Sequence, residues 1–66
     1  MTMLKVIEVL AESEKSWEDA AHVAIAQATK SLRHVRSINI ENFNATVKDG
    51  KIERYRINAK ISFVLE

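Results

Sequence analysis

Hydrophobic and polar residues alternate over the last stretch of the chain, Ile52–Leu65, where odd positions are mostly apolar and even positions mostly polar. A repeat of two residues predicts a β-strand with one buried and one solvated face. Most strands are only about 5–6 residues long, so this one is expected to be the spine of the sheet. A chain of this size cannot cover so long a strand alone, and the pattern therefore favours assembly of several copies.

The preceding residues predict two further strands and a helix. Leu4–Leu10 is aliphatic on both sides, which favours a strand covered by the helix on one face and by a neighbouring subunit on the other. An alanine-rich stripe with helical spacing begins after Ser16, a good N-cap residue, and predicts a helix from Trp17 to about Leu32. Val35–Val47 reads as a strand whose apolar phase changes near Glu41–Asn42, which predicts a bulge or bend.

The connections select one topology. Asp49-Gly50 between two strand patterns predicts a tight hairpin, because both central residues of a type I′ turn have positive φ. The first strand can join the free edge of the last one by a crossover through the helix. The expected fold is α+β, β-α-β-β, with a three-stranded antiparallel sheet in the order 1-3-2 that cradles one helix, as a single domain over residues 1–66.

Composition supports assembly and excludes several classes of partner. A core built from 66 residues is marginal, and the chain has no cysteine for disulfides or thiolate metal sites, so oligomerisation is the expected remedy. The net charge is +1 with both signs interspersed, which does not favour nucleic acid. No apolar run is long enough to span a membrane, and no signal peptide is recognised. We expect a cytoplasmic protein.

No catalytic motif is present. The two histidines, His22 and His34, are twelve residues apart and lie in no metal-binding or general-base pattern. The serines lack a nucleophile elbow, and a single glycine cannot build a phosphate-binding loop. The sequence therefore indicates a protein that is not an enzyme.

Three groups of residues have both a structural and a ligand-binding interpretation. Trp17 can pack within the fold or stack on a planar ligand. The ladder of Arg54, Arg56 and Lys60 can be a solvated sheet face or, in an assembly, the wall of a cavity that attracts anions. Acidic residues near the helix start can balance the helix dipole or form a weak divalent-cation site; they are Glu12, Glu14, Glu18 and Asp19.

The chain resembles the dodecin family in short segments along its whole length. These are KVIE at 5–8, SWEDA at 16–20, LRHVR at 32–36, DGK at 49–51, YRI at 55–57 and SFVLE at 62–66. The resemblance implies a β-α-β-β protomer and twelve copies in a hollow, roughly spherical homododecamer without enzymatic activity. It also implies binding of flavins such as riboflavin, lumichrome or FMN, stacked in pairs between tryptophans of symmetry-related chains.

The chain departs from this family at the flavin site. Ser37 stands where flavin-binding dodecins have the stacking tryptophan, and Arg56 stands where they have a glutamine that bonds the ring edge. The family's Arg-Gly late in the second strand is replaced by Asn44-Ala45. A serine offers no aromatic face, and an arginine only donates hydrogen bonds. Flavin binding is therefore expected to be weakened, although Ser37, Arg56 and Asn44 remain the candidate ligand-binding residues.

Three hypotheses remain at this point. The first is a dodecin-like shell that binds or stores a small ligand, with weakened affinity for FMN or riboflavin. The second is a calcium-binding assembly, because these changes resemble dodecins that lack the flavin tryptophan; no metal ligand is assigned. The third is a structural oligomer without a ligand.

Overall fold

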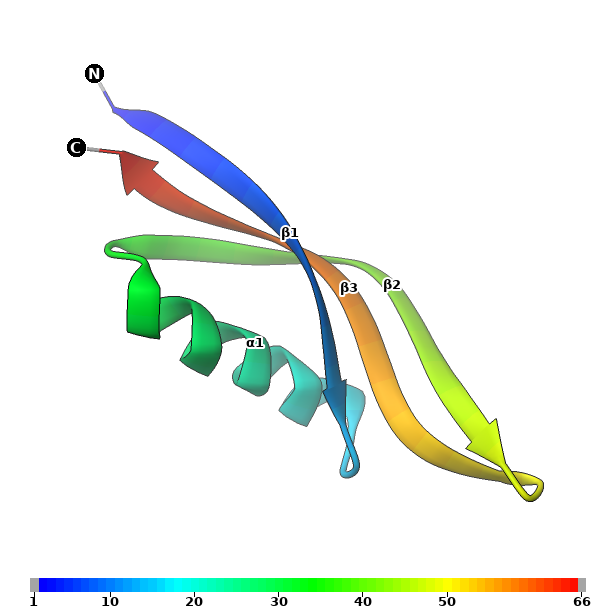
Figure 1. Cartoon of the computed structure of the whole chain (residues 1–66). Coiled ribbons are helices and arrows are strands. Elements are labelled where there is room, and N and C mark those ends of the chain that lie inside the picture. The colour runs from blue at the N-terminus through cyan, green and yellow to red at the C-terminus, as the bar shows by residue number, and fades with distance from the viewer. Residues whose placement is uncertain (1, 66) are drawn as a thin grey trace.

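The computed structural model describes residues 2–65 and has the predicted β-α-β-β order. The elements are β1 (Met3–Ser13), α1 (Trp17–Ser31), β2 (Val35–Lys48) and β3 (Lys51–Leu65). The strands form one antiparallel sheet in the order β1-β3-β2, and α1 lies against one face of it (Figure 1). The fold class, strand order and central position of the long strand are thus confirmed.

Strand β1 continues three residues beyond its predicted end at Leu10. Ala11 and Ser13 are buried, and the Ser13 hydroxyl donates a 2.6 Å hydrogen bond to Asp19 Oδ2 in the first turn of α1. The same hydroxyl accepts a hydrogen bond from the Lys15 backbone N–H at 2.9 Å. The sequence AES reads as a polar connection, but these bonds allow Ser13 to remain in the strand while it is buried.

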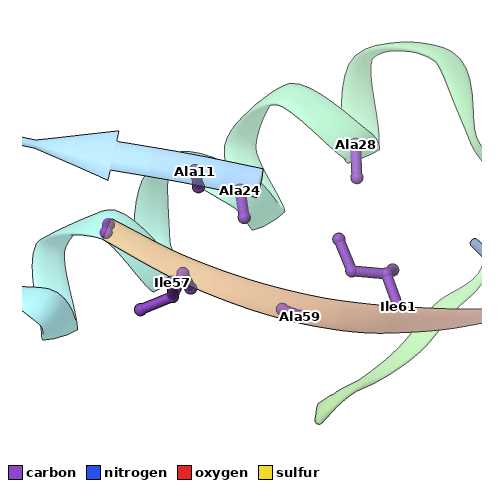
Figure 2. Close-up of a cluster of buried hydrophobic side chains, with 7 residues drawn as sticks. Ala11, Ala24, Ala28, Ile57, Ala59 and Ile61 are labelled. Carbon is purple, nitrogen blue, oxygen red and sulfur yellow. The ribbon is translucent and has the colours of Figure 1, made fainter. Parts of the chain in front are cut away.

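The core lies between α1 and the centre of the sheet. Ser16 caps the helix by accepting a hydrogen bond from the Asp19 N–H at 2.9 Å. Alanines on α1 bring the helix close to β3, where Ile57 and Ile61 are fully buried (Figure 2). The complete cluster is Ala11, Ala20, Ala24, Ala28, Ile57, Ala59 and Ile61. Small helical side chains therefore meet large strand side chains across this layer.

Irregularities in the β2–β3 pairing explain the phase changes in the sequence. The register shifts between Ile40 and Asn42, which confirms the bulge predicted near Glu41–Asn42. It also shifts between Val35 and Ser37, and between Thr46 and Val47. The shift at Ile40/Asn42 keeps Ile40 and Phe43 on the α1 side of the sheet, whereas the shift at Thr46/Val47 sets the exposed Val47 opposite Ile52.

The distal part of the β2–β3 hairpin, residues 43–55, extends past the helix, and we call it the arm (Figure 1). Its turn uses Asp49 and Gly50, which have φ values of 53° and 74°, as a primed hairpin turn requires. Trp17 fastens the base of the arm: its ring makes edge contacts with Tyr55 and Phe43 at centroid distances of 4.8 and 6.1 Å. Trp17 therefore packs within the fold, as the structural interpretation predicted.

Candidate ligand-binding face

The face of the sheet that is turned away from α1, which we call the polar face, carries most of the candidate residues. Residues paired across antiparallel strands point to the same side, so the register defines rows of side chains on this face. The rows that matter here are Glu12–Arg56–Asn44, Leu10–Asn58–Asn42 and Val6–Ser62–Ser37. All three predicted ligand-binding residues thus lie on the polar face.

The polar face does not bring those three residues together within one chain. Arg56 and Asn44 are direct cross-strand partners, whereas Ser37 pairs with Ser62. Ser62 is six residues further along β3 than Arg56, which corresponds to about 20 Å along an extended strand. A pocket that uses both Ser37 and Arg56 would therefore need side chains from more than one copy.

Ser37 is engaged in a hydrogen bond between hydroxyl groups. Its Oγ lies 2.5 Å from Oγ of Ser62, and both side chains point to the polar face. One hydroxyl donates to the other, and the pair presents no aromatic surface. The geometry at this position is compatible with the expected loss of ring stacking.

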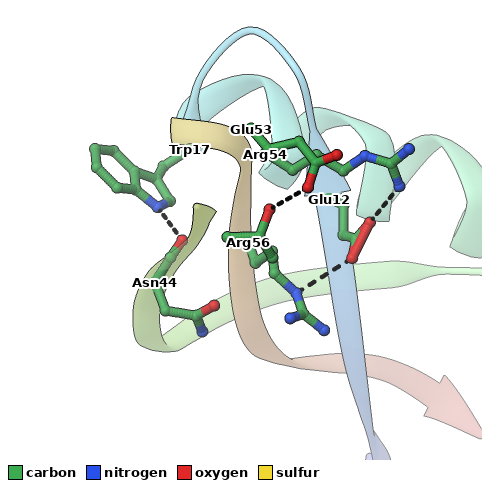
Figure 3. Close-up of polar contacts among 7 residues, drawn as sticks. Glu12, Trp17, Asn44, Glu53, Arg54 and Arg56 are labelled. Atoms are coloured by element: carbon green, nitrogen blue, oxygen red, sulfur yellow. Dashed lines mark hydrogen bonds and ion pairs between the residues drawn. The ribbon is translucent and has the colours of Figure 1, made fainter. Parts of the chain in front are cut away.

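Two arginines share one carboxylate at the other end of the polar face. Arg54 Nη1 lies 3.0 Å from Glu12 Oε2, and Arg56 Nε lies 3.2 Å from Glu12 Oε1 (Figure 3). Hydrogen bonding and charge attraction from Glu12 raise the pKa of Arg54 above its usual value. One negative charge between two positive ones leaves this group with a net positive charge.

The contact of Arg56 with Glu12 is an ion pair and not a hydrogen bond. The Nε atom is buried, yet its N–H is not directed at a hydrogen-bond acceptor among the described residues. Figure 3 shows the terminal nitrogens of the same guanidinium directed away from Glu12. A buried donor without an acceptor is costly and commonly bonds a water or an ion. The terminal nitrogens, which point away from Glu12, are the donors that this guanidinium can offer to a ligand.

A second ion pair lies further along the polar face. Lys60 Nζ is 3.0 Å from Glu41 Oε1, and the hydrogen bond and charge of Glu41 raise the pKa of Lys60 above its ordinary value. The bulge at Glu41 positions this carboxylate. The pair is electrically neutral, so the excess positive charge of the predicted ladder is concentrated at Arg54 and Arg56.

The residues considered for a metal site do not gather in one chain. Within residues 2–65, no group of three or more His, Cys, Asp or Glu side chains is arranged to hold a metal ion. Asp19 is bonded to Ser13, and Glu12 to the two arginines. His22 and His34 are both exposed, His22 on α1 and His34 after the helix. A cation site would need carboxylates from several copies.

Large apolar side chains remain exposed on two parts of the sheet. Leu4, Val6 and Leu10 alternate along the side of β1 that faces away from α1, and each is about half exposed. The arm exposes Phe43, Val47 and Ile52 to a similar or greater extent. A separate apolar groove of about 310 Å³ lies between β1 and α1, lined by Val9, Val23 and Ala28 among others.

The contribution of Glu12 was missed by the sequence interpretation, which grouped it with the acids at the helix start. The structure places it on β1, opposite Arg56. Extending the alternation of β1 past Leu10 would have put Glu12 on the polar face and supplied the missing signal.

Among the described residues, no helix is both long and apolar enough to cross a bilayer.

Comparison with known families and proteins gives one consistent result. The family model described as Dodecin matches residues 3–66. The chain is similar to the dodecin of Thermus thermophilus, with 29% identity over 62 residues, covering 94% of this chain and 90% of that protein. It is also similar to the calcium dodecin of Mycobacterium tuberculosis, with 39% identity over 64 residues, covering 96% and 89%.

Solved structures show the same similarity. A crystal structure of a T. thermophilus dodecin mutant superposes with a TM-score of 0.95 at 27% identity and covers 100% of this chain and 98% of that one. The crystal structure of the M. tuberculosis calcium dodecin, described as having a novel calcium-binding site, superposes with a TM-score of 0.85 at 34% identity, covering 97% and 91%.

Proposed function

The chain belongs to the dodecin family, and on that premise we propose that it is a non-enzymatic protein whose copies assemble into a hollow homododecamer that binds or stores a small ligand. Each copy contributes one domain, residues 1–66, and the assembly works in the cytoplasm. The proposal concerns both the copy number and the ligand, and each has its own test.

One observation carries the proposal: an extended sheet leaves large apolar side chains exposed in two separate regions. The molecule measures 51 × 20 × 13 Å along its principal axes, so its surface is large for its volume. A surface on which exposed apolar side chains are grouped in this way usually contacts a partner and does not remain in water. Burial of β1 and of the arm against sister chains would give this marginal core the cover that it lacks.

The experiment is mass spectrometry under native conditions, which reports the copy number and any retained small molecule together. We expect a mass near twelve chains. A monomer or dimer at micromolar concentration would refute the assembly, whatever the result for the ligand.

Flavin binding is proposed to be weakened relative to flavin-binding dodecins. The hydroxyl pair of Ser37 and Ser62 provides no stacking surface. Arg56 cannot accept a hydrogen bond from a ring N–H. The double change Ser37→Trp with Arg56→Gln should restore both functions and raise the affinity for riboflavin at least about tenfold, since ring stacking alone is worth roughly 1–3 kcal/mol.

Riboflavin is the right probe for this double variant because it carries no phosphate, so a charge effect at Arg56 does not confuse the result. Calorimetry on the double variant, each single variant and the parent separates the two contributions. An unchanged riboflavin affinity in the double variant, with the copy number intact, would mean that the pocket differs from the family's in other residues.

Calcium is the second candidate ligand, favoured by the 39% identity with a protein named calcium dodecin. Because residues 2–65 of one chain gather no cation-binding group, the site would form between copies. Calorimetry of chelator-treated protein should then show calcium binding by the assembly. If calcium produces neither heat nor a change in thermal stability, calcium is excluded as the ligand. If the assembly binds none of the tested ligands, a purely structural oligomer remains.

A further inference from the structure

We propose that Arg56 and its neighbours on the polar face form a binding site for an oxyanion, so that the stored ligand is a small molecule bearing a carboxylate or phosphate group. This inference rests on the proposed function, because it names the chemical class of the ligand. It is carried by an unusual combination at Arg56: a guanidinium held in place at one nitrogen and unused at the others.

The position of Arg56 is fixed by its own chain. Its side chain is only 31% exposed, and Glu12 holds Nε at 3.2 Å from one side. A guanidinium whose orientation is already set loses less conformational entropy on binding than a free side chain does. The terminal nitrogens then present a planar pair of donors, the arrangement that matches two oxygens of a carboxylate or phosphate.

Among residues 2–65, the buried Nε–H of Arg56 has no hydrogen-bond acceptor. Within the same residues, the one anionic contact of the guanidinium is the carboxylate that it shares with Arg54. Glu12 therefore neutralises one of the two positive charges. A buried donor without a partner is commonly explained by a bound water or ion.

Three asparagines lie in the same row as Arg56 or in the adjacent row of the polar face. Asn44 is its cross-strand partner on β2, and Asn58 lies two residues further along the same face of β3, paired with Asn42. None of these three side chains forms a hydrogen bond with another described residue. Each amide can donate to an oxyanion and accept from a neighbouring hydroxyl or N–H of the same ligand.

The surroundings determine the sign of the ligand. Further along the polar face, Lys60 is compensated by its pair with Glu41 and by Glu8, which lies opposite it on β1. Glu53 accepts a hydrogen bond from Thr46 at 3.4 Å and keeps its negative charge near Arg54. Glu53 and Glu14 also attract Arg54, so Arg56 is the less compensated of the two cations that share Glu12.

The chain offers a matched control for the test. Arg54 lies on the same face of the same strand, binds the same carboxylate and carries the same charge, but its side chain is 50% exposed. If only the overall charge attracts anions, Arg54→Gln and Arg56→Gln will weaken binding equally. If the oriented guanidinium of Arg56 binds the anion, only Arg56→Gln will weaken anion binding. Arg56→Lys will not restore the binding, because lysine lacks the planar, forked pair of N–H donors.

The measurement is calorimetric titration with inorganic phosphate and, separately, with acetate, at constant ionic strength set by sodium chloride. We expect binding of at least one anion, weakened about tenfold or more by Arg56→Gln and at least about fivefold by Arg56→Lys, but less than about threefold by Arg54→Gln. The anion that binds more tightly shows whether the site prefers a phosphate or a carboxylate group.

Two outcomes would overturn the inference: no binding of either anion, or equal losses in the Arg54 and Arg56 variants. Native mass spectrometry on each variant keeps these results separate from the proposed function. An intact dodecamer that binds neither anion would disprove the oxyanion site but would support the proposed dodecamer. A chain that stays monomeric would disprove the proposed dodecamer. Comparison of Arg54→Gln with Arg56→Gln would still test anion binding by the Arg56 guanidinium.

Discussion

Ile57 and Ile61 show how much of this fold depends on single residues. They are the largest fully buried side chains, and both lie on β3 beneath the alanines of α1. With only small side chains opposite, a cavity at either position has little around it that can move in. The alternation in Ile52–Leu65 identified both residues as core, because period two is independent of the rest of the fold.

Shortening Ile61 should therefore cost stability in proportion to the volume removed. We expect Ile61→Val to lower the free energy of unfolding by about 0.5–1.5 kcal/mol and Ile61→Ala by about 2–5 kcal/mol. Urea denaturation at one fixed protein concentration measures both, since assembly of the copies would make stability depend on concentration. Equal effects of the two substitutions would argue against a rigid alanine–isoleucine layer.

Lys60 and Glu41 supply a prediction about pH. The folded-state pKa of Lys60 is raised above its ordinary value of 10.5 by the hydrogen bond and charge of Glu41. A raised lysine pKa means that the folded state holds the proton more tightly. The contribution is therefore complete below pH 10.5 and is lost as the pH rises through the folded-state value.

Thermal unfolding between pH 9 and 12 tests this contribution. The parent protein should lose more stability over this range than Glu41→Gln, in which the amide cannot hold the lysine charge. The effect is expected to be small because both side chains are partly exposed to solvent. Parallel curves for the two proteins would show that the ion pair has no influence on folding.

At the scale of elements, the sequence determined the existence and order of the strands better than their ends. The end of β1 was placed too early because Ala11–Ser13 is polar in composition, and only the tertiary bond from Ser13 to Asp19 explains its burial. The bulge at Glu41 was predictable, since a change of apolar phase within one strand is visible in the sequence. The apolar phase also changes from Val35 to Ile38, so the bulge beside Ser37 left a signal that was missed. Phe43, Ala45 and Val47 keep one phase, so the bulge beside Val47 left none.

The start of α1 has a local stabilising element that can be tested alone. Ser16→Ala removes the side-chain acceptor for the Asp19 N–H and should reduce stability by about 0.5–2 kcal/mol. Ser16→Asp keeps an acceptor at the cap and should retain most of the stability. Chemical denaturation of the two variants decides the point; an alanine variant as stable as the aspartate variant would contradict a capping role.

At the scale of the whole molecule, the candidate site is the part that could be inferred least from the sequence. The residues Ser37, Asn44 and Arg56 were identified by resemblance, but their separation on the polar face emerges only from the register. The partnership of Glu12 with two arginines depends on β1 pairing with β3 across a long crossover. The order 1-3-2 was predicted, but no local pattern of residues encodes the register that sets Glu12 opposite Arg56.

The arm gives the prediction that belongs to this scale. Val47 is 68% exposed beside Ile52, its cross-strand partner, on a segment that α1 does not cover. If sister chains cover the arm, Val47→Lys will place a charge in an interface and shift the assembly to species smaller than twelve chains. Light scattering measures the shift, and Thr29→Lys on the exposed face of α1 is the control. A Val47→Lys protein that still forms twelve-chain assemblies would show that the arm is not part of an interface.

The indole at the base of the arm makes the protein its own optical reporter. The chain contains a single tryptophan, Trp17, whose ring touches Tyr55 and Phe43 and whose Nε1–H donates to the Asn44 carbonyl oxygen at 2.8 Å. Its fluorescence emission therefore comes from one known location, next to the strand residue that faces Arg56. Docking of the arm and occupation of the neighbouring face can be followed in real time, without attaching a dye.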